Sequence, residues 1–464
     1  MIVMKFGGTS VEDAASIERI ADIIKDRLAL KPIIVVSAMG KTTRKLLEAS
    51  ESSAAGDGRA TMSLIADLKT RHLSEARRLI HSNSARSAFS LIEGHFEELK
   101  KLLEGLAVLG EVPPRGLDKI LSYGELLSSA IVADALGERG IPARLVDSRG
   151  LIKTDDRYGA ASVLFELTDR GISEALSPVV ESGEVPVLQG FIGSTREGAT
   201  TTLGFEGSDY TAAIVGAAMG VEDIQIWKDV SGLMTADPAV FPKARTVKAC
   251  SFAEAAELTY FGAKVLHPKA IHPAALKNIP VHIYNSKRPS ATGTAIDRCA
   301  PACANLIKSI AYKRPVSVIR AAADAGSAGA FTDEFLKGLI DALGRRRIIP
   351  LLTAVSASRA AFAVDSQALA SGMERDLLED LSRLAICEVE SGKAIISLVG
   401  EGLGDEPAFA SRVFKAVDET RLGVIMHGSS PISMNFVVDG HDVEGVIARL
   451  HEVFFSELDA RVFE

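Results

Sequence analysis

Short apolar runs alternate with helical patterns over the first 300 residues, and this alternation limits the fold more than any other feature. Residues 2–6 form a β-rich run that two glycines end, and residues 33–36 form a continuous apolar strand. Such a strand is typical of a parallel sheet covered by helices on both faces. Further strand-like runs occur at Ala143–Val146, Val185–Gln189, Asp223–Trp227 and Val281–Tyr284. The pattern predicts an α/β domain with a mostly parallel sheet.

Two helical regions stand out within this domain. Residues 41–139 are strongly helical, and we interpret them as an excursion from the sheet that forms a lid or a side layer. The helix after Ser208 consists almost entirely of Ala, Gly, Ile, Val and Met. Because small side chains permit close approach, we expect this helix to lie flat on the sheet.

The pattern changes near residue 300, where loop-like segments give way to shorter strand and helix units. These units recur after about 75–80 residues, which indicates a divergent internal repeat. Each copy reads as βαββαβ, although two unrelated α/β pieces are the alternative. We therefore predict a catalytic domain over residues 1–300, followed by two small domains over 301–385 and 386–464.

Composition excludes several classes of protein. The 52 basic and 60 acidic residues give a formal net charge of −8, which argues against a broad nucleic-acid-binding face. Four cysteines make no disulfide framework and fit a reducing cytoplasm. No apolar run approaches the roughly 18 residues of a membrane span, and the N-terminus does not resemble a signal peptide. We expect a cytoplasmic protein without a membrane partner.

Five segments carry residues suited to chemistry. In the first, residues 5–10, Lys5 and two glycines precede a helix start, and together they suit a phosphate group. In the second, residues 37–43, Gly40-Lys41-Thr42 looks like the end of a phosphate-binding P-loop, but Val35 stands where that motif needs glycine. No dinucleotide-binding glycine fingerprint follows a strand either.

The other three segments are residues 200–211, 227–238 and 261–268. In the first of these, a glycine-bearing loop leads into Ser208 and Asp209, which could also simply cap a helix. The segment at residues 227–238 follows a predicted strand directly. The last contains His267, which we interpret as a structural histidine because no second histidine stands at ligand spacing.

In this order, the five segments resemble the aspartokinases of the amino-acid kinase superfamily, over nearly the whole chain. Lys-Phe-Gly-Gly-Thr-Ser at residues 5–10 is highly specific for that family, and Gly-Ser-Asp-Tyr-Thr-Ala at 207–212 supports it. The repeated units resemble a pair of ACT domains. The resemblance implies an amino-acid kinase-like αβα sandwich with a mostly parallel sheet, plus two ferredoxin-like βαββαβ units. We expect no fused homoserine dehydrogenase.

The resemblance implies phosphoryl transfer from ATP to L-aspartate, giving 4-phospho-L-aspartate on the route to lysine, threonine and methionine. Lys5 would stabilise the transferred group, and Asp209 would orient Lys5 or help to hold a Mg²⁺ ion. The β-carboxylate needs no general base because it is ionised at neutral pH. The expected phosphate-binding residues are Gly7, Gly8, Thr9 and Ser208.

The resemblance also implies the substrate contacts. Ser37, Thr43 and Glu125 would face aspartate, with Glu125 beside its ammonium. The expected ATP-binding residues are Lys228, Asp229, Met234, Asp237 and Lys264. The family usually has Arg-Gly where Phe205-Glu206 stand here, so another cation must bind a substrate carboxylate. Candidates for that cation are Arg149, Arg157 and Arg196. Lys228, Met234 and Ala239 replace the frequent Thr, Tyr and Arg.

Regulation and assembly follow from the ACT pair. We expect an amino-acid effector, lysine or threonine, and a homodimer. Two alternatives stay open at this point. One is another member of the superfamily, a glutamate, acetylglutamate, carbamate or uridylate kinase. The other is a catalytically dead amino-acid sensor, which the departures at Phe205 and Met234 would allow.

Overall fold

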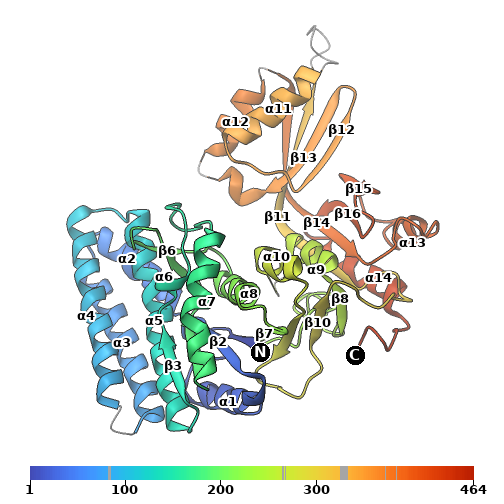
Figure 1. The fold of residues 1–464 in the computed structure, drawn as a ribbon. Coiled ribbons are helices and arrows are strands. Elements are labelled where there is room, and N and C mark those ends of the chain that lie inside the picture. The colour runs from blue at the N-terminus through green and yellow to red at the C-terminus, as the bar shows by residue number, and fades with distance from the viewer. Residues whose placement is uncertain (82–84, 264–265, 267, 324–332, 371, 383) are drawn as a thin grey trace. The chain divides into compact units, whose positions relative to one another are not determined.

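The computed structural model of the 464-residue chain describes all residues except 82–84, 264–265, 267, 324–332, 371 and 383 (Figure 1). It divides into two compact units. The N-terminal unit comprises Met1–Gly232 and Val265–Cys299, and the C-terminal unit comprises Leu233–Lys264 and Ala300–Glu464. The domain boundaries at residues 300 and 385 stay predictions, and the structure groups residues 233–264 with the C-terminal part of the chain.

The N-terminal unit is built on a mostly parallel sheet, as predicted. Its strands are β1 (Ile2–Phe6), β2 (Pro32–Val36), β3 (Ala143–Val146), β4 (Val185–Gln189), β7 (Asp223–Lys228), β9 (Val281–Asn285) and β10 (Thr294–Asp297). Within this unit they lie in the order β3-β4-β2-β1-β7-β9-β10, and β9–β10 is the only antiparallel pair among those that the structure describes here. The order places β1 at the centre, where Lys5 lies opposite Val35 and Ile226.

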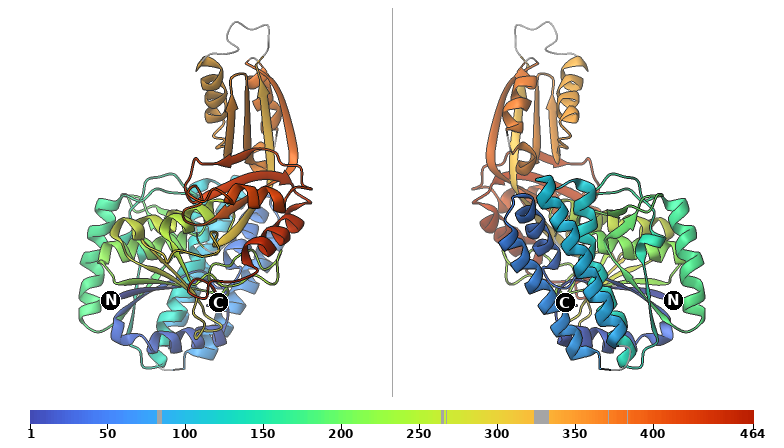
Figure 2. Two further views of the ribbon diagram at one scale, coloured as in Figure 1. Left: turned by 90° about the vertical axis from the view of Figure 1, so that its right-hand side faces the viewer. Right: turned by 90° about the vertical axis from the view of Figure 1, so that its left-hand side faces the viewer.

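Helices cover both faces of this sheet and make it an αβα sandwich (Figure 2). One layer consists of α7 (Phe165–Glu181), α8 (Gly207–Met219) and α10 (Pro268–Lys277). The other contains α1 (Ala14–Lys25) and α5 (Pro114–Glu138), with α2 (Thr42–Ala54), α3 (Gly58–Leu79) and α4 (Ala85–Leu109) packed outside them. Helices α2, α3, α4 and α5 form the predicted helical excursion.

Two of these helices have compositions that their positions explain. In α8, a Cβ on Gly216 would lie 2.6 Å from Cδ1 of Ile224 on β7, so the helix lies directly on the sheet as predicted. Helix α5 is long and apolar enough, by composition alone, to cross a membrane. Most of its apolar stretch is buried inside the protein, so its place as a core helix accounts for its composition.

The C-terminal unit contains one sheet that both ACT-like repeats share. Its strands are β11 (Ser309–Ala322), β12 (Leu352–Ser356), β13 (Arg359–Asp365), β14 (Ile386–Val399), β15 (Ile425–His427) and β16 (Ser433–Asp439). The order is β12-β13-β11-β14-β16-β15, and every described pair is antiparallel. Strands β11 and β14, with 14 residues each, are the longest of this sheet, because each serves both repeats.

The repeats therefore have the predicted βαββαβ form, with shared strands. The helices are α11 (Asp333–Arg345), α12 (Met373–Ser382), α13 (Phe409–Ala416) and α14 (Val443–Phe455). The first repeat runs from β11 to β14. The second runs from β14 to α14, and the first half of β11, which pairs with β14 over Ser309–Lys313, takes the place of its last strand. Neither repeat has a complete sheet of its own.

A buried ion pair ties residues 233–264 into the C-terminal unit. This segment holds β8 (Ala249–Ser251) and α9 (Phe252–Tyr260). Helix α9 begins with a capping box in which Ser251 and Glu254 satisfy each other's backbone N–H groups. Glu254 Oε2 also lies 2.7 Å from Lys308 Nζ, and both side chains are fully buried. The remaining short elements are η1 (Leu28–Leu30), α6 (Ser148–Leu151), β5 (Ile192–Ser194), β6 (Thr200–Thr202) and η2 (Ser366–Leu369).

Candidate active site

The turns that follow β1, β2 and β7 meet at one edge of the parallel sheet. Gly7 N donates to Trp227 O at 3.0 Å, and Ser37 N donates to Phe6 O at 3.1 Å. Gly40 N donates to Gly8 O at 3.0 Å. Ligands of open α/β sheets bind at the carboxyl ends of the strands, so this edge is the expected place for a site.

A cavity of about 570 Å³ opens at this edge. The residues predicted from sequence that line it are Lys5, Gly7, Gly8, Thr9, Ser37, Ser208, Asp209, Lys228 and Asp229. A Cβ on Gly8 would lie 2.9 Å from Ala38 O, so the close approach of the two turns requires glycine there. The structure thus brings together residues from four of the five segments, which are far apart in sequence.

Two lysines converge on one buried carboxylate at the floor of the cavity. Lys5 Nζ lies 2.6 Å from Asp209 Oδ1, and Lys228 Nζ lies 2.8 Å from Asp209 Oδ2. Burial alone would raise the pKa of Asp209, but the two positive charges hold it below its ordinary value. Asp209 is therefore a fixed anion that orients both lysines. This geometry favours the orienting role over a metal-binding one, because its oxygens already contact the lysines.

Glu206 extends this cluster to four alternating charges. Its Oε1 lies 3.5 Å from Lys228 Nζ, and the residue lines the cavity. The neighbouring Phe205 is 82% exposed. Of the two residues that depart from the family pattern, Phe205 therefore faces solvent and Glu206 lines the cavity.

Glu125, on α5, does not line the cavity but contacts the turn that follows β2. Its Oε1 accepts a hydrogen bond from Ala38 N at 3.1 Å, and its Oε2 is buried with no hydrogen-bond partner among the residues that the structure describes. Burial raises the pKa of its carboxyl to about 8. A Cβ on the adjacent Gly124 would lie 3.6 Å from Thr43 Oγ1, so Thr43 belongs to the same neighbourhood. The carboxyl is therefore largely protonated at neutral pH, and a cationic group at Oε2 would favour its ionised form.

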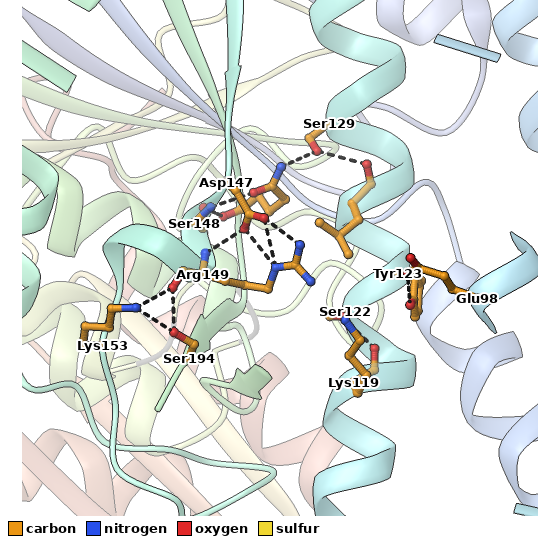
Figure 3. A network of polar contacts seen from close by, with 12 residues as sticks. Glu98, Lys119, Ser122, Tyr123, Ser129, Asp147, Ser148, Arg149, Lys153 and Ser194 are labelled. Carbon is orange, nitrogen blue, oxygen red and sulfur yellow. Dashed lines mark hydrogen bonds and ion pairs between the residues drawn. The ribbon is translucent and has the colours of Figure 1, made fainter. Parts of the chain in front are cut away.

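Arg149 is not among the residues that line the cavity, and its guanidinium faces Asp147 (Figure 3). Its guanidinium is bound to Asp147, with Nη2 2.6 Å from Oδ2 and Nε 3.0 Å from Oδ1. The hydrogen bond and charge of Asp147 raise the pKa of Arg149 further. The other candidates, Arg157 and Arg196, are exposed and do not line the cavity either.

Two further cations do line the cavity. Arg71, on α3, donates from Nη1 to Gly40 O at 2.7 Å and from Nη2 to Glu12 O at 2.8 Å. Lys41 stands beside it, exposed and in a left-handed backbone conformation with φ 57°. Sequence reasoning missed Arg71 because it lies in the helical excursion, in no recognisable motif.

The remaining predicted ATP contacts lie in the C-terminal unit. Met234 O accepts a hydrogen bond from Ser309 Oγ at 2.7 Å, and Asp237 Oδ2 accepts one from Tyr312 Oη at 3.3 Å. Neither residue is among those that line the cavity. Lys264 and His267 lie outside the described residues.

Family models and individual relatives both place this chain among proteins of one family. The model of the amino acid kinase family matches residues 1–285, and an ACT domain model matches residues 396–454. Aspartokinase 1 of Arabidopsis thaliana is 36% identical to this chain, over 98% of the chain and 80% of that protein. Lysine-sensitive aspartokinase 3 of Escherichia coli is 33% identical, over 98% of the chain and 99% of that protein.

Solved structures agree with the sequence relatives. Escherichia coli aspartokinase III in complex with aspartate and ADP, in its R-state, superposes with a TM-score of 0.87 at 31% identity, covering 98% of this chain and 100% of that one. The T-state of that enzyme, in complex with lysine and aspartate, gives a TM-score of 0.78 at the same identity, with 98% and 99% covered.

Proposed function

The chain belongs to the aspartokinases of the amino acid kinase family, and from this premise we propose how its residues carry out the reaction. It is an aspartate kinase, which transfers a phosphoryl group from ATP to the β-carboxylate of L-aspartate. The observation that carries the proposal is the convergence of Lys5 and Lys228 on buried Asp209, beside the Gly7–Gly8 turn.

In the proposed reaction, a β-carboxylate oxygen attacks the γ-phosphorus while the bond to the bridging oxygen breaks, and ADP leaves with that electron pair. Two anions must approach, so positioning and charge neutralisation dominate the barrier. Lys5 stabilises the charge on the transferred group. Lys228 faces the ATP phosphates with Asp229, while Gly7, Gly8, Thr9 and Ser208 supply short polar contacts at the turn and at the start of α8.

The donor set fits a Mg²⁺ ion that arrives with ATP. Mg²⁺ prefers oxygen ligands and is usually bound through substrate phosphates and one or two carboxylates. Asp209 does not suit this role, since both its oxygens contact lysines. Asp229 lines the cavity and is exposed, so we propose it as the protein ligand. The ion would neutralise charge on the phosphate oxygens when bound.

For aspartate, we propose that Glu125 pairs with the ammonium group, and that Ser37 and Thr43 contact the rest of the molecule. The cation for a substrate carboxylate is Arg71 in this proposal. Its guanidinium is fixed by two backbone carbonyls at the cavity wall, which leaves further N–H donors for an anion. Arg149, predicted from sequence, is instead engaged with Asp147.

The proposal extends to regulation and assembly. The ACT domain match and the lysine complex of the Escherichia coli enzyme support an amino-acid effector, lysine or threonine, at the shared sheet of the C-terminal unit. ACT-like sheets commonly pair between chains, which supports a homodimer. The cysteines that the structure describes are all free, which is consistent with the cytoplasm as the proposed compartment.

The catalytic proposal is tested by trapping the acyl phosphate with hydroxylamine in the presence of ATP, Mg²⁺ and L-aspartate. Lys5→Ala should lower kcat/KM by roughly 10³-fold, the range for loss of one preorganised charge contact. The matched control is Lys25→Ala, an exposed lysine at the end of α1, which should behave as the wild type. Near-normal activity of Lys5→Ala would refute the role of Lys5, and no hydroxamate from the wild type would refute the reaction.

A further inference from the structure

Glu206 occupies a backbone conformation that a glutamate rarely adopts. It precedes α8 with φ 52° and ψ 28°, in the left-handed region, where the Cβ of an L-residue is crowded. Its side chain makes no capping hydrogen bond to the helix, so helix capping does not explain it. Strained residues of this kind gather at functional sites, and the inference runs from the observed outlier to a function.

The side chain points into the four-charge cluster of the cavity. Its exposed fraction is 17%, its Oε1 lies 3.5 Å from Lys228 Nζ, and its Oε2 is buried with no hydrogen-bond partner among the described residues. Lys228 Nζ lies 2.8 Å from Asp209 Oδ2 on its other side. Asp209 is shared with Lys5, so it offers Lys228 only one of its two oxygens. Glu206 supplies the second carboxylate.

This second carboxylate affects both the charge and the place of Lys228. Burial would lower the pKa of Lys228, but the charges of Asp209 and Glu206 raise it above its ordinary value. Burial raises the pKa of Glu206 above its ordinary value, although the positive charge of Lys228 acts to lower it. The lysine stem passes the glycine turn, since a Cβ on Gly7 would lie 3.9 Å from Lys228 Cγ and 3.7 Å from Lys5 Nζ. The Lys5 ammonium and the Lys228 stem thus both lie beside Gly7.

We propose that Glu206 is a positioning residue, whose carboxylate holds the Lys228 ammonium beside the Gly7–Gly8 turn so that it meets the phosphates of ATP. This rests on the proposed function, in which Lys228 contacts those phosphates. It also explains the strain at Glu206, because the left-handed backbone turns the carboxylate into the cavity instead of toward the helix N-terminus. Glu206 acts through Lys228 and does not itself touch the transferred group.

The test compares Glu206→Gln with the wild type in steady-state kinetics, with ATP and aspartate varied separately. Glutamine keeps the size and the backbone strain but removes the charge. We expect kcat/KM for ATP to fall by up to roughly 10²-fold, the effect of a displaced catalytic contact. We also expect the KM for aspartate to stay unchanged, because Glu206 contacts Lys228, which faces the phosphates of ATP in this proposal. Glu174→Gln, an exposed glutamate on α7, is the matched control and should change neither quantity.

A double-mutant cycle shows whether Glu206 acts through Lys228. In a Lys228→Met background, Glu206→Gln should cause little further loss. Glu206→Gly guards against misfolding, because glycine accepts this backbone conformation, and it should show the same kinetic loss as glutamine. Thermal unfolding of all variants confirms that they are folded.

Three results would overturn the inference. These are an unchanged kcat/KM for ATP in Glu206→Gln, an equal loss with and without the Lys228 side chain, and a loss that added Mg²⁺ restores, which would make Glu206 a metal ligand. The inference and the proposed function fail separately. If the wild type forms hydroxamate and Lys5→Ala does not, while Glu206→Gln matches the wild type, only the inference is lost.

Discussion

Glu125→Gln should remove a pH dependence that the wild-type protein carries. Burial raises the pKa of the Glu125 carboxyl to about 8, from an ordinary value of 4.5. Between these values the folded protein holds a proton that the unfolded chain has released. The free energy of unfolding therefore falls as pH rises: the contribution is fully present below pH 4.5 and is lost as pH passes through 8.

The size of the effect follows from the slope of about 1.4 kcal/mol per pH unit for one proton. From pH 6 to pH 8 the wild type should lose about 2 kcal/mol relative to Glu125→Gln, because ionisation begins to level the curve near pH 8. Urea denaturation at pH 6, 7 and 8 measures it. The fluorescence of Trp227 reports the N-terminal unit alone, since it is the only tryptophan of the chain and is fully buried on β7.

Aspartate binding should show the opposite trend. If the ammonium of aspartate pairs with ionised Glu125, binding must expel the proton, so the KM for aspartate should fall roughly tenfold or more between pH 6 and pH 8. In Glu125→Gln the KM should be higher and nearly independent of pH. Glu97→Gln, an exposed glutamate on α4, is the control. The reasoning would be refuted if the free energy of unfolding changed with pH equally in the wild type and in Glu125→Gln. It would also be refuted if the wild-type KM for aspartate did not change with pH.

Three further predictions concern the ion pair of α9, the glycine turn and the effector. Lys308→Met should lower the free energy of unfolding of the C-terminal unit by about 3–5 kcal/mol, measured by denaturation followed by circular dichroism, because it leaves Glu254 buried without its partner. Gly8→Ala should lower the free energy of unfolding of the N-terminal unit by about 1–3 kcal/mol and reduce kcat/KM for ATP, because the added Cβ would lie 2.9 Å from Ala38 O. Lysine or threonine should change the rate or the melting temperature, and an absence of any response to the common amino acids would contradict an ACT effector site.

The sequence alone predicts the elements whose signals are local. The inner strands of the parallel sheet are short, largely apolar and buried, so their bounds agree with the structure within one or two residues, as at Val185–Gln189. The site turns were also predictable, because glycine and lysine in one short segment define the turn that follows β1. Both are properties of a few neighbouring residues.

What sequence could not show depends on contacts between distant residues. The sharing of β11 and β14 by two repeats depends on strand pairing across the unit, and a repeat read from the sequence has its own strands. Arg71 reaches the cavity through packing, and its own segment carries no motif that points there. Glu206 lies in one of the five segments, but it departs from the family pattern, so that pattern assigns it no role. Arg149 was predicted from its charge, but the structure pairs it with Asp147, two residues earlier in the chain.

The cluster at the cavity floor raises a question about how an acidic protein binds ATP. With Lys5, Asp209, Lys228 and Glu206 all ionised, the positive and negative charges cancel, so net attraction to phosphate is not what they provide. Their pairing fixes two ammonium groups on Asp209, in the cavity that the glycine turn also lines, before any ligand arrives. Charges held in place in this way stabilise a transition state without reorganising at the moment of reaction. A net charge of −8 is therefore compatible with phosphoryl transfer, because the site depends on the placement of its charges and not on their sum.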